Sequence, residues 1–185
     1  LLDWPCATYK LYSEINLGCR RGVLAAISWF FEHEEEGIII EDDCLPNGEF
    51  FEYCRLLLAR YRYDSRVWSI SGNNFQNGAW HGNSSYYFSQ YSHCWGWASW
   101  RRSWQHYDEE FKGFQRYVGT DNNLYDNPIE NLYWLARFAK LLLYSKPDTW
   151  DYQWMYTIKV HNGLCILPNI NLVGNIGFGE LASNT

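Results

Sequence analysis

The chain has 185 residues, of which 47% are hydrophobic and 19% are charged, and its formal net charge is −6. This length is typical of one domain and is enough to bury about 70% of the unfolded surface, so a disordered or collagen-like chain is excluded. The acidic balance argues against broad nucleic-acid binding, which requires a basic face. We therefore expect a single domain over residues 1–185, with no nucleic-acid partner.

Neither a membrane span nor a secretion signal is predicted. No stretch approaches the about 18 consecutive apolar residues of a transmembrane helix, and the chain does not open with a signal peptide. The six cysteines are scattered and form no CxxC pair, which indicates reduced thiols in a cytoplasmic protein. Because the first residue is Leu1 and not Met, we expect a domain that is partial at its N-terminus.

Hydrophobic spacing predicts the elements of the first half of the chain. Residues 7–15 have the mixed pattern of a short strand, and residues 20–33 repeat apolar side chains three and four apart, as on an amphipathic helix. Residues 37–40 form a continuous apolar run, which is typical of a strand buried on both faces at the centre of a parallel sheet. A helix with Asn47 as its N-cap and a strand over residues 66–71 follow.

The second half continues the alternation of strands and helices. We expect a strand over residues 86–89, an aromatic loop over 93–97, a helix from Pro128 to Tyr144 with Asn127 before it, a helix over 150–161, a strand over 164–167, and a Gly- and Asn-rich tail over 168–185. This order predicts an α/β fold with a mostly parallel sheet flanked by helices.

Three adjacent carboxylates, Glu41, Asp42 and Asp43, follow the predicted central strand. Open α/β sheets bind ligands beyond the carboxyl ends of their strands. Because neighbouring carboxylates repel one another, we expect a cation among them, and Mn²⁺ or Mg²⁺ is held by one or two carboxylates together with substrate phosphates. The alternative is a solvated acidic turn or a group of helix-capping residues.

Asp151 lies between two tryptophans, Trp150 and Trp154, at helical spacing. A carboxylate in apolar surroundings has a raised pKa and can serve as a general base. The alternative, which the residues alone slightly favour, is that Asp148 or Asp151 caps the helix while the tryptophans pack in the core.

A second group of tryptophans follows the predicted aromatic loop. The run Trp95-Gly96-Trp97 offers flat faces that suit a sugar ring. Trp97, Trp100 and Trp104 also recur at helical spacing, which favours packing in the core.

The segment of residues 37–61 (GIIIEDDCLPNGEFFEYCRLLLARY) resembles the strand, acidic motif and helix of inverting nucleotide-sugar glycosyltransferases with a GT-A fold. It is most similar to the N-acetylglucosaminyltransferase I type and its bacterial relatives. The likeness continues in order through VWSISG, YSHCWGWASW, WDYQW and PNINLVGNIGFG, and so spans nearly the whole chain. Such relatives begin with a strand, a helix and a second strand that do not precede Leu1, and their closing loop often ends near a histidine, which is absent here.

The resemblance implies an inverting transferase that moves a sugar from a nucleotide-diphosphate donor, such as a UDP-sugar, to a hydroxyl of a glycan or another acceptor. In that family the residue at Asp43 binds Mn²⁺, its neighbours Glu41 and Asp42 contact the donor, and the residue at Asp151 is the general base. Residues 169–179 resemble a loop that closes over the donor. The further donor-binding residues that the resemblance implies are Trp95, Gly96, Trp97, Asn171 and Asn175.

Two other functions compete with this one. A carbohydrate-binding domain without catalytic activity would also use tryptophans to hold a glycan. A sugar nucleotidyltransferase would bind similar substrates, although the sequence shows no Gly-rich phosphate loop near the N-terminus. Hydrolysis of nucleotide-sugars with Mn²⁺, with and without an acceptor, separates the three.

Overall fold

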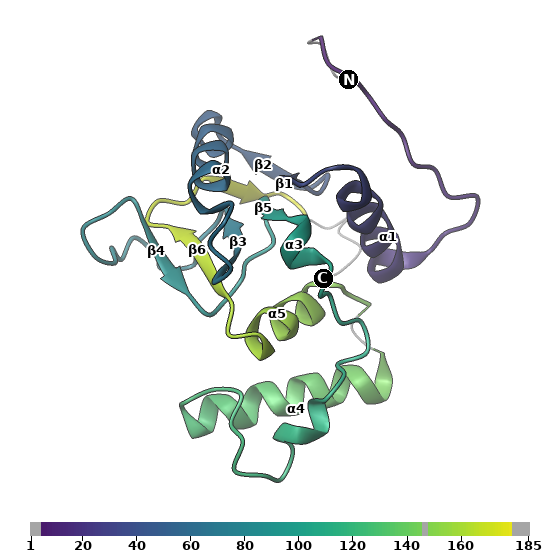
Figure 1. Ribbon diagram of the computed structural model, residues 1–185, viewed down its shortest axis with the longest axis vertical. Coiled ribbons are helices and arrows are strands. Elements are labelled where there is room, and N and C mark those ends of the chain that lie inside the picture. Colours follow the sequence, from purple (N-terminus) through teal and green to yellow (C-terminus); the bar gives the residue numbers. More distant parts are fainter. Residues whose placement is uncertain (1–4, 146–147, 179–185) are drawn as a thin grey trace.

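The computed structural model describes residues 5–145 and 148–178 (Figure 1). The helices are α1 (Gly18–His33), α2 (Gly48–Tyr61), α3 (Arg101–Trp104), the 3-10 helix η1 (Phe114–Tyr117), α4 (Pro128–Tyr144) and α5 (Asp151–Val160). The strands are β1 (Glu36–Ile39), β2 (Cys44–Pro46), β3 (Val67–Ser71), β4 (Tyr86–Ser89), β5 (Trp97–Trp100), β6 (Leu164–Pro168) and β7 (Val173–Asn175). Every predicted helix and strand is present to within two residues, except the strand over residues 7–15. The predicted tail over residues 168–185 lies partly outside the described residues.

The fold is α/β, but the sheet is mixed. Five strands follow the order β1-β5-β3-β6-β4, and β2 and β7 form a separate pair. Only β3 and β6 are parallel neighbours, whereas β5 is antiparallel to both β1 and β3, and β4 is antiparallel to β6. The expectation of a mostly parallel sheet is therefore wrong. Strands β1, β3 and β6 do share one direction, but β4 and β5 run opposite to it. No helix lies between β3 and β4, so the chain reverses through a loop there instead of making the helical crossover that a parallel strand requires.

Two predictions about the N-terminal part are also wrong. Strand β1 lies at an edge of the sheet, where it pairs with β5 and is only half-buried. Residues 5–16 form no helix or strand, and their side chains are exposed along an arm that leads away from the body (Figure 1). A run of β-branched residues thus favours a strand, but its place in the sheet depends on which other strands pair with it.

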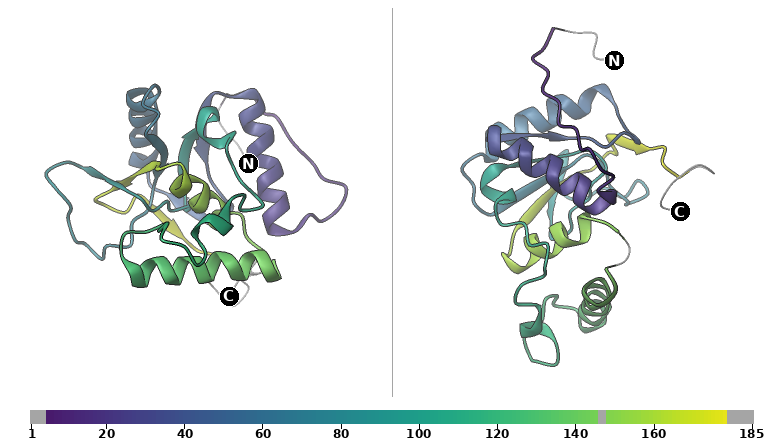
Figure 2. Two further views of the ribbon diagram at one scale, coloured as in Figure 1. Left: turned by 60° about the horizontal axis from the view of Figure 1, so that its bottom comes forward. Right: turned by 90° about the vertical axis from the view of Figure 1, so that its right-hand side faces the viewer.

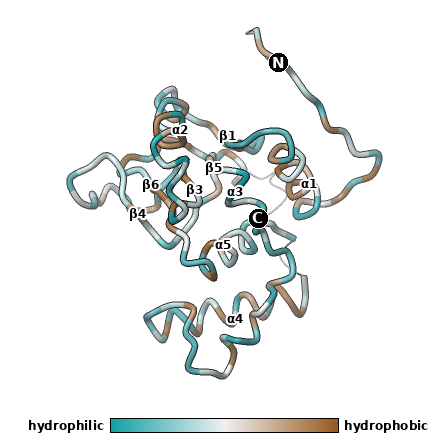
Figure 3. Tube along the Cα trace, in the orientation of Figure 1, coloured by the Kyte–Doolittle hydropathy of each residue, from teal (hydrophilic) through white to brown (hydrophobic). Residues whose placement is uncertain are grey.

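The sheet has an apolar core on each face. Successive residues of a strand point to opposite faces, so in β5 Ala98 packs with α2, while Trp97 packs with α1, α3 and α5. In β3 a register shift between Val67 and Ser69 turns Trp68 to the face opposite that of Ile70. Helix α4 packs against α5 on the side away from the sheet, as two further views show (Figure 2). Hydrophobic residues recur along both helices and strands (Figure 3). Within the described ranges, no helix is both long and apolar enough to cross a membrane.

Five tryptophans form one contact network beneath the sheet. The members of this tryptophan cluster are Trp68, Trp97, Trp104, Trp150 and Trp154. The ring of Trp97 stacks on that of Trp150 with centroids 5.5 Å apart, and the rings of Trp104 and Trp154 lie 5.1 Å apart. Core packing is thus the correct reading for these residues. Trp97 and Trp100 are the first and last residues of β5, and Trp104 is the last residue of α3. Their spacing in the sequence therefore does not come from a single helix.

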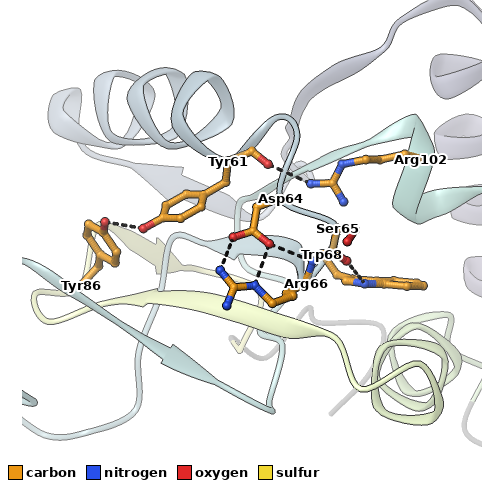
Figure 4. Close-up of polar contacts among 7 residues, drawn as sticks. All are labelled: Tyr61, Asp64, Ser65, Arg66, Trp68, Tyr86 and Arg102. Carbon is orange, nitrogen blue, oxygen red and sulfur yellow. Dashed lines mark hydrogen bonds and ion pairs between the residues drawn. The ribbon is translucent and has the colours of Figure 1, made fainter.

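Polar contacts hold the C-terminal end of α2 against the sheet (Figure 4). The hydroxyl oxygens of Tyr61 and Tyr86 lie 2.7 Å apart, and Arg102 donates to the backbone carbonyl of Tyr61 at 3.0 Å. Asp64 accepts from the guanidinium of Arg66, which begins the turn into β3. These contacts stabilise the fold on the side of the sheet where α2 ends.

Side-chain caps define the helix starts. Asn47 Oδ1 accepts from two backbone N–H groups of α2, each at 3.1 Å, and Asn127 caps α4 in the same way, as predicted. The cap of α1 comes from a distant part of the chain, because Asp148 Oδ2 accepts from the backbone N–H of Cys19 at 3.0 Å. Asp148 therefore caps α1 and not the helix that follows it.

Replacement of Asp148 by alanine should destabilise the protein by about 1 kcal/mol, because it removes an acceptor from the N-terminus of α1. Asp148→Asn should retain most of the stability, since an amide oxygen also accepts this bond. Urea unfolding monitored by tryptophan fluorescence measures both. An alanine variant as stable as the unmodified protein would contradict the capping role.

Candidate functional site

The three carboxylates of the acidic motif lie in the turn between β1 and β2. Asp42 is exposed, and Glu41 and Asp43 are half-buried. This turn follows a strand end, as expected, but the strand is at the edge of the sheet and not at its centre.

The C-terminal segment packs directly on this turn. Strand β7 pairs with β2, and the backbone N–H of Ile176 donates to the carbonyl of Asp43 at 2.9 Å. A Cβ atom on Gly177 would clash with Asp43 Oδ2, so a larger residue at this position would displace that carboxylate. The segment that the resemblance describes as a closing loop therefore meets the acidic motif, although Gly179 lies outside the described residues.

The carboxylates influence one another's ionisation. Burial, followed by the nearby charges of Asp43 and Asp151, raises the pKa of Glu41 to about 7, and the Trp150 side chain opposes part of this rise. Burial, followed by the nearby charges of Glu41, Asp148, Asp151 and Asp43, also raises the pKa of the Cys19 thiol. Asp151 is thus close enough to the acidic motif to act on it electrostatically, although the two are far apart in the sequence.

Within the described residues, no group of three or more His, Cys, Asp or Glu side chains is arranged to hold a metal ion. A hard divalent cation does not need one when substrate phosphates supply the remaining oxygens. Asp43, half-exposed at the turn, fits this arrangement as a single protein ligand.

Asp151 also lines a cavity of about 320 Å³. This cavity is formed where the loop after β3 and the loop before β5 meet the start of α5 and one side of α4. Its lining includes Asn73, Phe75, Tyr91, Trp95, Trp134 and Tyr152. We call it the aromatic cavity.

Asp151 is the first residue of α5 and does not act as a cap. The N-cap position is Trp150, which makes no side-chain cap bond, and the Thr149 hydroxyl donates to the Asp151 carboxylate. Trp150 and Trp154 are buried in the tryptophan cluster, whereas Asp151 is half-buried in the cavity wall. The structure thus places the two tryptophans in the core and leaves the carboxylate beside a cavity.

The residues of the WGW motif have three different environments. Trp95 lines the aromatic cavity. Gly96 has a φ of 60°, and a Cβ there would lie 2.9 Å from Val173, so glycine is required by backbone conformation and by packing. Trp97 is fully buried in the tryptophan cluster, so its side chain has no exposed surface for the predicted contact with the donor.

The two asparagines expected to bind the donor hold the C-terminal segment together. Asn171 Oδ1 accepts from the backbone N–H of Asn74 at 3.0 Å, and its Nδ2 donates to the carbonyl of Val173 at 2.9 Å. Asn175 Oδ1 accepts from the backbone N–H of Gly177 at 2.7 Å. With β7 paired to β2 and the N–H of Ile176 bonded to Asp43, the backbone is anchored up to residue 176, while the side chains of Ile176 and Phe178 are exposed.

Sequence reasoning did not find four residues of the cavity. Asn73, Phe75, Trp134 and Tyr152 come from three separate elements, and their spacing in the chain carries no common pattern. The Gly72-Asn73-Asn74 turn at the end of β3 was the single available signal, because polar residues beyond strand ends often belong to sites.

Comparison with known proteins assigns no family to this chain. No family model matches it, and no curated protein matches it either. The function is therefore argued from the geometry of the acidic motif, Asp151 and the aromatic cavity.

His93, at the edge of the cavity, should make the protein less stable in acid. Burial lowers its folded-state pKa to about 4, so between this value and the unfolded value of about 6.5 only the unfolded chain binds the proton. The free energy of unfolding is therefore unaffected by His93 above about pH 6.5. It decreases as the pH falls towards 4, by up to about 3 kcal/mol, because protonation favours the unfolded chain.

Urea unfolding at about pH 7.5 and about pH 4.5 tests this effect in the unmodified protein and in His93→Gln. The unmodified protein should lose more stability than the variant over this interval. Glu41 titrates in both proteins, so the difference between them isolates His93. Equal losses would contradict the assignment.

Proposed function

We propose that this protein is a metal-dependent, inverting glycosyltransferase that moves a sugar from a nucleotide-diphosphate donor, such as a UDP-sugar, to an acceptor hydroxyl. The observation that carries the proposal is that Asp151 lies within electrostatic reach of the acidic motif and also lines the aromatic cavity. This arrangement offers one location for a charged donor and another for an uncharged acceptor, with a carboxylate near both.

The acidic motif is the proposed donor side. Asp43 would hold Mn²⁺ or Mg²⁺ as a single protein ligand, and exposed Asp42 lies next to it for donor contact. When bound, the ion neutralises charge on the diphosphate leaving group. A bound cation would in turn favour the ionised form of Glu41, whose pKa is raised by burial and neighbouring carboxylates.

Asp151 is the proposed general base. Its carboxylate would accept the proton of the acceptor hydroxyl as that oxygen attacks the anomeric carbon from the face opposite the diphosphate, which inverts the configuration there. The Thr149 hydroxyl holds one carboxylate oxygen and thereby orients the other. General-base catalysis of this kind contributes about 10²–10⁴-fold to the rate.

A carbohydrate-binding protein without turnover is the second candidate, and the aromatic cavity favours it independently of the acidic motif. The six cysteines are free, which accords with the proposed cytoplasmic location.

Asp151→Asn should lower kcat by about 10²-fold or more, because the amide cannot accept the proton, while donor affinity remains nearly constant. The assay measures nucleotide release from a panel of UDP-sugars with Mn²⁺, with and without glycan acceptors. Asp148→Asn is the matched control, since Asp148 caps α1 and should leave turnover unchanged. Retained turnover in Asp151→Asn would exclude Asp151 as the base.

Asp43→Ala should abolish Mn²⁺-dependent binding of the UDP-sugar without unfolding the protein. Calorimetric titration with and without Mn²⁺ measures this. Asp121→Ala, which removes an exposed carboxylate in the loop before α4, should bind as the unmodified protein does. Unchanged metal-dependent affinity in Asp43→Ala would exclude Asp43 as the metal ligand.

A further inference from the structure

Asn73 is a buried side chain whose hydrogen-bonding groups are unused. It is 1% exposed, and neither its amide nitrogen nor its amide oxygen has a hydrogen-bond partner among the described residues. Buried amides are nearly always paired, so an unpaired one calls for a specific explanation. Asn73 is also one of the residues that line the aromatic cavity.

The backbone on both sides of Asn73 is fixed. Gly72 donates to the carbonyl of Gly96 at 2.8 Å and accepts from Leu172 at 2.9 Å. On the other side, the backbone N–H of Asn74 donates to Asn171 Oδ1 at 3.0 Å. Asn73 is therefore held in place before a ligand arrives, which reduces the entropy cost of binding.

Aromatic rings make up much of the remaining wall. Phe75 contacts Trp95 with ring centroids 5.0 Å apart, and Trp134 contacts Tyr152 at 6.3 Å. Such rings bury the apolar C–H faces of a sugar ring, while a few polar groups fix its orientation. The cavity volume of about 320 Å³ is at the small end of the range of about 300–1,000 Å³ for ligand sites, which favours a ligand of one or two rings.

The charge of the cavity excludes an anionic ligand. Among the described residues that line it, Asp151 is the one formally charged side chain, and none is a lysine or an arginine. Burial keeps His93 neutral at pH 7 by lowering its pKa to about 4, and burial raises the pKa of the Cys94 thiol. A phosphate or nucleotide would therefore be repelled, whereas an uncharged polyol would not.

We infer that the aromatic cavity binds an uncharged pyranose ring and that Asn73 is a specificity-determining residue that pairs with two neighbouring hydroxyls. A hydroxyl both donates and accepts, so two of them satisfy the amide nitrogen and the amide oxygen together. The assignment of this sugar as the acceptor rests on the proposed function, because a ring held here presents a hydroxyl to Asp151. The binding itself does not depend on turnover.

The test uses a panel of methyl pyranosides (glucoside, galactoside, mannoside and N-acetylglucosaminide) without metal or donor. Saturation-transfer NMR and tryptophan fluorescence should show saturable, millimolar binding of at least one of them. Cyclohexanol, a ring of similar size without the extra hydroxyls, should bind at least tenfold more weakly. Absence of binding by every methyl pyranoside, or equal binding of cyclohexanol, would overturn the inference.

Asn73→Leu keeps a similar volume but removes both hydrogen-bonding groups, and it should weaken binding at least tenfold. Equal affinity in a folded Asn73→Leu variant would show that Asn73 does not touch the sugar. Should that variant fail to fold, Phe75→Leu replaces it, because Phe75 is 53% exposed and little packing depends on it. It should weaken binding, whereas Tyr63→Leu, at an exposed tyrosine outside the cavity, should not.

Asp151→Asn separates this inference from the proposed function. Sugar binding by Asp151→Asn at the affinity of the unmodified protein, with turnover lost, supports both. Sugar binding in a protein that shows no turnover with any donor supports the cavity and rejects the transferase. In an active protein, Asn73→Leu should raise KM for the acceptor with donor affinity unchanged, and an unchanged KM rejects the role of Asn73.

Discussion

The stacking of Trp97 on Trp150 determines where the candidate site lies. Trp97 begins β5 at the interior of the sheet, and Trp150 immediately precedes α5, so this contact ties the start of α5 to the sheet. Aromatic pairs of this kind add about 0.5–1.5 kcal/mol beyond the area that they bury. Asp151 is the next residue, and its position beside both the acidic motif and the cavity follows from the burial of its neighbour.

Close backbone approach joins the two sides of the site. A Cβ atom on Gly72 would lie 2.6 Å from the Val173 side chain, and one on Gly96 would lie 2.9 Å from it. These glycines let β7 pack against the ends of β3 and the loop before β5. The same segment then pairs with β2 and reaches Asp43 through Gly177. The loop that shapes the cavity and the turn that carries the carboxylates are therefore parts of one packed unit.

The two sides differ in electrostatic character. In the acidic motif, burial and neighbouring carboxylates raise the pKa of Glu41. A bound cation would reduce the repulsion between these carboxylates. The aromatic cavity is close to neutral and carries an unsatisfied amide. Such a difference suits the proposed reaction between a charged donor and an uncharged hydroxyl compound. The donor is then disfavoured in the aromatic cavity, and the acceptor is disfavoured at the acidic motif.

Local patterns in the sequence were sufficient for most individual elements. Asn47 and Asn127 begin their helices because an asparagine side chain accepts the free N–H groups of the first turn, an interaction that needs only neighbouring residues. The sheet order, the edge position of β1 and the burial of Trp97 were decided by tertiary structure, because β5 inserts between β1 and β3 through long-range pairing that no local period encodes. Glu41, Asp43 and Asp151 were recognisable as candidates by residue type and motif. Their electrostatic coupling, the cap that Asp148 provides to α1 and the unpaired amide of Asn73 depend on contacts between distant segments, which only the folded chain brings together.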